Sequence, residues 1–383
     1  MNPYFPDYLD LDSDSNSDSD SNSDSDAELP PEAGVVARQF ERIDLYRIAN
    51  DDFRDRFRMQ KATFDRLFQL VEADFGRERR GRHPISARNR LLIGIRFFAI
   101  GTTQQIFADL FRISQPTVSR IVAQVSEILA RKANQFVQFP TENQVQPIKE
   151  GFAEIDDFPN IIGLIDCTHI KVNIIKPEQH WFRDRKTNIT LNCQAIIDHN
   201  MMFTNFVCRW PGTTHDSRIF RNSQVAADLA NNRFGGYLLG DSGYGCTPFL
   251  LTPLLGEEHV GADRRYNVAH RRTRIMIEQA FGRFKHKFRC CLDGFRCQTV
   301  MNAIPACVML WNYIKIFEKD CVHYGNNEQV GGEEDEEDED ERVRREMLQV
   351  MAEQDAGEEE DNLDPPPAPG LRNDDGKDRT SVV

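Results

Sequence analysis

One apolar run constrains the fold of this chain more than any other feature. Residues 161–172 read IIGLIDCTHIKV, in which four aliphatic side chains and a glycine precede Asp166. A short run that is apolar at consecutive positions is typical of a strand buried on both faces, as at the centre of a sheet. The run therefore predicts a central strand, and we ask which groups further along the chain accompany its carboxylate.

The segments after this run predict the rest of the sheet. Two β-rich segments, 188–198 and 202–210, are separated by a tight turn, and an amphipathic helical segment follows at 215–232. Residues 235–244 form a short apolar strand that ends in Asp241, and helical patterns return at 271–288. This order is that of the ribonuclease H-like fold: an antiparallel three-strand meander, a crossover helix and a parallel fourth strand beside the first. We expect an α/β nuclease core of this type.

Four acidic residues converge in this predicted topology. The first and fourth strands lie side by side, so Asp166 and Asp241 meet, while Asp216 begins the crossover helix and Glu278 lies on a helix that can pack against the same edge. Crowded carboxylates raise one another's pKa unless a cation neutralises them, and oxygen ligands favour Mg²⁺ or Mn²⁺. We predict that all four bind metal and that Asp166, Asp241 and Glu278 are catalytic, with Asp166 bridging two ions that promote hydrolysis of a phosphodiester.

Each acid also has a structural explanation. Asp166 could end a strand, Asp216 could begin a helix, and Asp241 could form a turn with the two residues after it. Glu278 could pair with Arg274 one helical turn earlier. Their joint placement on one strand order favours the metal site.

Residues 34–135 form a predicted all-α region that contains a helix-turn-helix. One helix is expected to turn Ile106, Leu110 and Ile113 inward, and the next to bury Val118, Ile121, Val122 and Val125. Between them, Ser114 is a natural N-cap and Pro116 suits the first turn. In such units the second helix enters the DNA major groove, so we predict DNA contacts by Gln115, Thr117, Ser119 and Arg120, with Lys132 near the phosphates. The alternative is an ordinary helical hairpin whose polar residues face water.

Charge is divided unevenly along the chain. Residues 1–33 carry 10 acids and no Lys or Arg, and residues 325–383 carry 21 acids and 6 bases, which leaves 30 acids and 41 bases in between. The two acidic ends read as disordered tails, because they repel themselves and have little to bury. The basic body suits a polyanion, and the basic helix around Glu278 is expected to position DNA through Arg274, Arg283 and Lys285, although a solvated basic face is the alternative.

Cysteine usage and hydropathy restrict the class of protein further. The nine cysteines include no C-x-x-C pair, which favours reduced thiols over disulfides or a zinc site. No uninterrupted apolar run approaches the ~20 residues of a membrane span, so we expect no membrane partner. We predict tails at 1–33 and 325–383, a helical region at 34–135 and a nuclease domain at 152–320.

Several motifs, taken together, resemble a known family. IDCTH, GTTHDSRIF, LLGDSGYG, LTPLL and RIMIEQAFGRFKHKFR are similar, in order and spacing, to the DDE domain of PIF/Harbinger transposases, and above all to their domesticated, transposase-derived nucleases. The resemblance spans roughly residues 50–320. It implies a nuclease with divalent-metal sites at the four acids named above, a nuclear and cytoplasmic location, and a Myb-like DNA-binding partner protein. Many mobile members have glycine at the position of Cys167 and proline at that of Gly245.

Three functions remain open from the sequence. The first is a metal-dependent DNA nuclease of transposase descent, and the second is a catalytically silent DNA-binding or regulatory protein of the same origin. The third is an adaptor whose acidic tails bind basic partners. A homo-oligomer is compatible with each of them.

Overall fold

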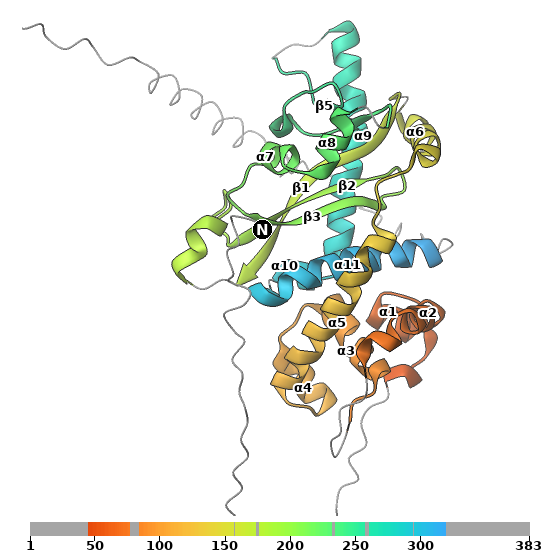
Figure 1. Ribbon diagram of the computed structural model, residues 1–383, viewed down its shortest axis with the longest axis vertical. Helices are drawn as coiled ribbons and strands as arrows, with labels where there is room; N and C mark the ends of the chain where they lie inside the picture. The colour runs from red at the N-terminus through yellow and green to blue at the C-terminus, as the bar shows by residue number, and fades with distance from the viewer. Residues whose placement is uncertain are drawn as a thin grey trace, which may run out of the picture. The chain divides into compact units, whose positions relative to one another are not determined.

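The chain folds into a mixed sheet with helices on both faces and a helical region (Figure 1). The computed structural model describes residues 45–76, 84–156, 158–173, 176–231, 234–256, 260–293 and 295–318. The two predicted acidic tails lie outside these residues.

The sheet has the strand order β3-β2-β1-β4-β5, and β6 pairs with the end of β1. Antiparallel pairing joins β1 to β2 and β2 to β3, whereas β4 is parallel to both β1 and β5. The predicted meander with a parallel fourth strand beside the first is therefore present. The strands are β1 (Ile161–Asn173), β2 (Thr190–Ile197), β3 (Phe203–Pro211), β4 (Tyr237–Leu239), β5 (Leu250–Leu251) and β6 (Phe295–Arg296).

The central strand is buried along its first half only. The five residues from Ile161 to Ile165 are buried, and from Asp166 onward buried and more exposed positions are mixed. The run that predicted a central strand thus corresponds to the part of β1 covered on both faces. Asp166 stands where that cover ends, well inside the strand.

Helices cover both faces of the sheet. On one face, α7 (Asp216–Arg221) and α8 (Gln224–Ala230) bury a small apolar core against β1 and β4. On the other face, α9 (Gly261–Lys287) packs on β1 and contributes to a larger core. Figure 1 shows α9 as the long helix that crosses the sheet. Short 3-10 segments, η3 (Lys176–Phe182) and η4 (Ser242–Tyr244), follow β1 and β4.

The helical region shares the larger core with the sheet. The last helix, α11, packs against both α5 and β3, so it joins residues near the end of the described chain to the helix-turn-helix. Residues 299–317 of α11 are long and apolar enough to cross a membrane, but two thirds of the matching stretch is buried in the core, as expected of a core helix.

The remaining helices have the following bounds. The helices are α1 (Asn50–Phe57), α2 (Lys61–Val71), α3 (Ala87–Ile100), α4 (Gln104–Phe111), α5 (Gln115–Phe136), α6 (Glu142–Asp156), α10 (Cys290–Asp293) and α11 (Cys297–Phe317), with 3-10 turns η1 (Leu45–Arg47) and η2 (Glu72–Phe75).

The helix-turn-helix is present, but the predicted inward face of α4 was wrong for Ile106 and Leu110, whereas Ile113 packs against the core as predicted. Ile106 is 55% exposed and Leu110 is 46% exposed, whereas Phe107 and Phe111 are buried. The two phenylalanines bury more area than the aliphatic side chains, and Phe107 packs edge-on against Phe97 of α3, so they decide which side of the helix faces the core. For α5 the predicted inward residues are all buried: Val118, Ile121, Val122 and Val125.

Two glycines within helices differ in the space around them: Gly94 is crowded and Gly282 is not. A Cβ atom added to Gly94 of α3 would lie 2.6 Å from a methyl carbon of Val125, whereas one added to Gly282 of α9 would meet nothing within 4 Å. The contact at Gly94 lets α3 and α5 approach closely. Gly282 therefore offers a matched reference without crowding.

We predict opposite stability changes for alanine at these two glycines. Gly94→Ala should lower the free energy of unfolding by about 1–3 kcal/mol, because the new methyl group overpacks the α3–α5 contact. Gly282→Ala should leave it unchanged or raise it by up to about 1 kcal/mol, since alanine favours the helix. Urea denaturation of both variants checks this, and equal changes would show that the α3–α5 contact tolerates the added methyl group.

Candidate active site

The pairing of β4 with β1 places two of the predicted acids together. Leu239 of β4 lies opposite Leu164 of β1 in the parallel register. Two residues further along each strand direction are Asp241 and Asp166, so both carboxylates reach the same place. Asp241 also begins the 3-10 turn η4, where its side chain accepts a hydrogen bond of 3.1 Å from the amide of Gly243. Asp241 therefore both caps η4 and contributes a carboxylate to the acidic cluster.

A third acid joins them from the other side of the meander. Asp216 is the first residue of α7, and one carboxylate oxygen from each of Asp166, Asp216 and Asp241 lies within 4.8 Å of the others. The side-chain amide of Asn192 in β2 donates at 2.8 Å to Asp216 and at 2.8 Å to the carbonyl of Thr214. Asn192 is 1% exposed, so it fixes the loop after β3 from inside the sheet.

Burial and mutual repulsion make the site electrostatically strained. Burial, and next the charge of Asp241, raise the pKa of Asp166 to about 7. The pKa of Asp241 is also raised, first by burial and then by Asp216. The three carboxylates thus hold more negative charge than their surroundings neutralise.

The fourth predicted acid, Glu278, lies outside this group of three. Its carboxylate pairs with Arg274 one turn earlier in α9, and the same guanidinium contacts Asp166 at 3.2 Å. Glu278 is therefore linked to the cluster through Arg274, and its side chain is 50% exposed. The structure thus contains the Arg274–Glu278 ion pair that the sequence offered as an alternative to metal binding, and this pair lies at the edge of the site.

The residues present fit a hard divalent cation. Three carboxylate oxygens already lie close together, and oxygen donors are the ligands that Mg²⁺ and Mn²⁺ prefer. The raised pKa values of Asp166 and Asp241 indicate a place where a cation would lower the repulsion. Of the four acids predicted to bind metal, the structure brings Asp166, Asp216 and Asp241 together and leaves Glu278 one ion pair away.

Cys167 lies beside the acids but carries no charge. Its sulfur is 3.2 Å from the hydroxyl of Tyr244, and burial raises the pKa of the thiol well above its usual value. Tyr244 is itself buried, with a strongly raised pKa caused mainly by burial. A neutral thiol and phenol thus form one wall of the site and add no negative charge to it.

The residues predicted to contact DNA differ in their surroundings. At the start of α5, Gln115 donates to Gln104, and Thr117 shares hydrogen bonds with Ser114 and Arg120. Arg120 is exposed and Ser119 partly exposed. Ser114 stands at the N-cap as predicted, although its hydroxyl bonds that of Thr117.

Of the four remaining basic residues predicted to contact DNA, Lys132, Lys285 and Arg274 are bonded to other groups of the protein. Lys132 pairs with Asp74 at 3.0 Å, and Lys285 donates at 2.9 Å to the carbonyl of His169. Arg283 is exposed and contacts the sulfur of Met201 at 3.9 Å, while Arg274 is held by its two carboxylates.

Sequence reasoning missed the polar residues of β2, of which Asn192 supports the site. Thr190, Asn192 and Gln194 alternate along a strand whose every residue is buried. Polar residues at every second position of such a strand share one face, and this alternation was visible in the segment NITLNCQAIID. The side-chain amide of Gln194 has no hydrogen-bond partner within the described part of the chain.

Comparison with known proteins agrees with this geometry. Residues 165–312 match the model of the DDE superfamily endonucleases, a range that contains all four acids. The human protein named "Putative nuclease HARBI1" is 31% identical over 281 residues, which cover 70% of this chain and 80% of that protein. This chain belongs to the Harbinger transposase-derived nuclease family.

Two further relatives are similarly distant. The bovine protein of the same name is 32% identical over 281 residues, again covering 70% of this chain and 80% of the relative. The "Protein ALP1-like" of Arabidopsis thaliana is 26% identical over 287 residues, which cover 68% of this chain and 70% of its own length. No solved structure matches this chain.

The raised pKa of Asp166 predicts a pH-dependent loss of stability in the metal-free protein. The folded state keeps a proton up to about pH 7 that the unfolded chain releases near pH 4, so stability falls as pH rises between these values. The shift sets an upper limit of about 4 kcal/mol for this contribution. Urea denaturation of wild type and Asp166→Asn from pH 4 to 8 checks it. The difference in stability between the two should change in favour of the variant as pH rises, and a constant difference would contradict the assignment.

Proposed function

We propose that this protein is a DNA nuclease that hydrolyses phosphodiester bonds with a divalent cation, Mg²⁺ or Mn²⁺, held by carboxylates on a ribonuclease H-like core. The observation that carries the proposal is the meeting of Asp166, Asp216 and Asp241 within 4.8 Å. Strand order supports it, since a meander followed by a crossover and a parallel strand is the arrangement of that fold. Membership of the endonuclease superfamily supports it independently.

The carboxylates are held in place by different elements. Asp166 is fixed within β1 and its Oδ1 accepts a 2.7 Å hydrogen bond from the amide of Cys167, while η4 orients Asp241 and Asn192 orients Asp216. A divalent cation bound there would activate a water molecule and stabilise the leaving oxygen of a phosphodiester. Because rigid hydrogen bonds position each carboxylate before any ligand arrives, little reorganisation is needed when the cation binds.

Arg274 and Glu278 have linked roles in this proposal. The guanidinium of Arg274 neutralises part of the charge on Asp166 and at the same time holds the carboxylate of Glu278. Because Glu278 lies on the same helix as Arg274 and is half exposed, its carboxylate is free to reorient once the ion pair breaks. We therefore keep Glu278 as a proposed catalytic ligand that is released from Arg274 in the active state.

DNA binding is proposed for two surfaces. The start of α5 presents Arg120, Thr117 and Ser119 in the manner of a recognition helix. The exposed bases of α9, which include Arg271, Arg272 and Arg283, suit the phosphate backbone next to the acids. The Myb-like partner protein and the nuclear and cytoplasmic location implied by the resemblance stay predictions.

One observation favours a second candidate function. The Arg274 side chain already balances two of the four acids without any metal, so the arrangement is compatible with a protein that has kept the fold and binds DNA without cutting it. Cleavage assays separate the two functions.

We predict that the purified full-length chain cuts plasmid DNA in Mg²⁺ or Mn²⁺ and not in EDTA. Asp166→Asn and Asp241→Asn should each lower the rate at least about a hundredfold, because each removes a metal ligand. Asp263→Asn is the matched control, since Asp263 is an exposed acid in the first turn of α9, and should keep the wild-type rate. Circular dichroism confirms folding of each variant. Absence of cutting by folded wild-type protein in both metals would favour the silent DNA-binding function.

The recognition helix gives a separate prediction. Arg120→Ala should weaken binding to DNA that the wild type selects from a random pool, by about 1–3 kcal/mol, and should relax the preference over scrambled sequence. Arg131→Ala, an exposed arginine in a later turn of α5 that lies 3.7 Å from Glu127, should keep that preference. Fluorescence anisotropy measures both affinities. An unchanged preference in Arg120→Ala would leave α4 and α5 as an ordinary helical hairpin.

A further inference from the structure

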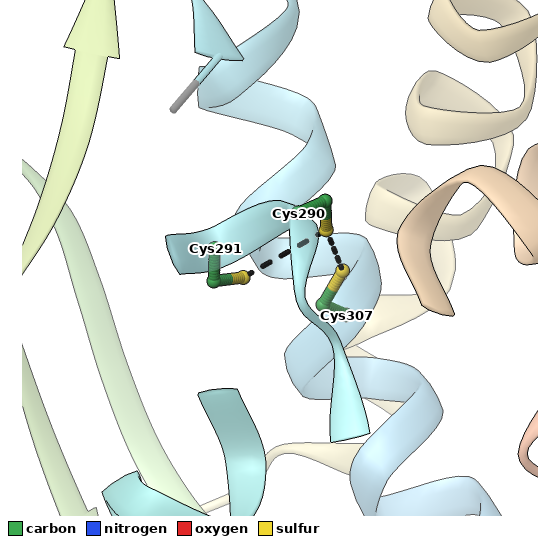
Figure 2. A group of neighbouring side chains, drawn as sticks. All are labelled: Cys290, Cys291 and Cys307. Carbon is green, nitrogen blue, oxygen red and sulfur yellow. Dashed lines mark hydrogen bonds between the residues drawn. The ribbon is translucent and has the colours of Figure 1, made fainter. Parts of the chain in front are cut away.

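Three cysteines meet in the core, away from the carboxylates. Cys290 and Cys291 are neighbours in α10, and Cys307 lies in α11, with side chains exposed by 2%, 1% and 0%. Figure 2 shows the three sulfurs gathered between the two helices. The sulfur of Cys290 is 4.0 Å from that of Cys291 and 3.8 Å from that of Cys307, and all three sulfurs lie within 4.8 Å of one another.

These separations match those of sulfurs that share one metal ion. With metal–sulfur bonds of about 2.3 Å, two sulfurs on a common ion are about 3.8 Å apart in a tetrahedral arrangement and about 4.0 Å apart in a trigonal one. Among the described side chains, this is one of two groups of three or more possible metal ligands, and the other is the acidic cluster. Because the donors here are sulfurs, the two groups select different metals.

We infer that Cys290, Cys291 and Cys307 form a binding site for a thiophilic metal ion, with Cu⁺ as the occupant. Thiolate sulfur is a soft donor that selects Cu⁺ and Zn²⁺ over Mg²⁺ and Mn²⁺. Structural zinc is almost always four-coordinate, and the group contains three ligands among the side chains that the structure describes. A three-sulfur set enclosed by apolar core therefore suits Cu⁺ better than Zn²⁺.

The site would fasten two parts of the core. Cys290 and Cys291 directly follow α9, which carries Glu278, whereas Cys307 belongs to the helix that packs on α5. The backbone at Cys290 is also in close contact with Gly101 at the end of α3, where an added Cβ atom would lie 2.6 Å from the amide nitrogen of Cys290. A metal ion here would link α10 to α11 at a point where α10 already contacts the end of α3.

The test uses the full-length chain produced in copper-supplemented cells and purified without oxygen. We expect one equivalent of copper to stay with the protein after exchange against a chelator, and X-ray absorption at the copper edge to show three sulfur neighbours. Cys291→Ser and Cys307→Ser should each retain at least about tenfold less copper. Copper should also raise the unfolding temperature of the wild type.

Two controls separate this site from other binding. Cys246→Ser removes an exposed cysteine and Asp166→Asn removes an acidic ligand, and both should keep the copper. If the serine variants fail to fold, the spectrum of the wild type still decides, because oxygen neighbours or fewer than three sulfurs would overturn the inference. Retention of zinc in place of copper would overturn the assignment of Cu⁺, and retention of neither metal would leave three buried thiols.

Discussion

The parallel pairing of β4 with β1 is the contact on which the site depends. β4 is three residues long, and its register against β1 sets Leu239 opposite Leu164. A shift of one residue would turn Asp241 to the other side of the chain, since side chains alternate along a strand. The short strand is held on its other edge by β5 and below by the apolar residues of α7 and α8. The packing of these apolar residues therefore fixes the separation of Asp166 and Asp241.

Bringing three acids together in a partly buried site destabilises their charged forms, and two kinds of side chain reduce this repulsion. Asn192 gives a neutral amide to Asp216 from inside the sheet, and Arg274 gives a full positive charge to Asp166 and Glu278. The neutral amide of Asn192 positions Asp216 without cancelling its charge. Arg274 cancels part of the charge of Asp166, and we propose that this arginine moves away in the active state. A site of this kind stays assembled without a cation and yet keeps most of its negative field for one.

The sequence predicted the parts of the structure that follow from local pattern and strand order. The meander, the parallel fourth strand and the meeting of Asp166 with Asp241 could be predicted because hydrophobic runs mark strands and topology rules limit their order. The side of α4 that faces the core could not be predicted, because Phe107 and Phe111 compete with aliphatic residues for burial and tertiary packing decides between them. Glu278 lies outside the group of three because it pairs with Arg274 one turn earlier, an alternative that the sequence offered but could not decide against the metal site.

The cysteines illustrate the same limit. Cys290, Cys291 and Cys307 have none of the spacing that marks a zinc motif, and the sequence favoured ordinary reduced thiols. They meet because α10 turns back onto α11, a tertiary contact between segments that the sequence alone does not pair. That same late helix has a consequence for biosynthesis: the part of α5 that packs on α11 stays uncovered until residues 297–317 have been synthesised. Until then the nascent helix-turn-helix exposes an apolar surface suited to chaperones.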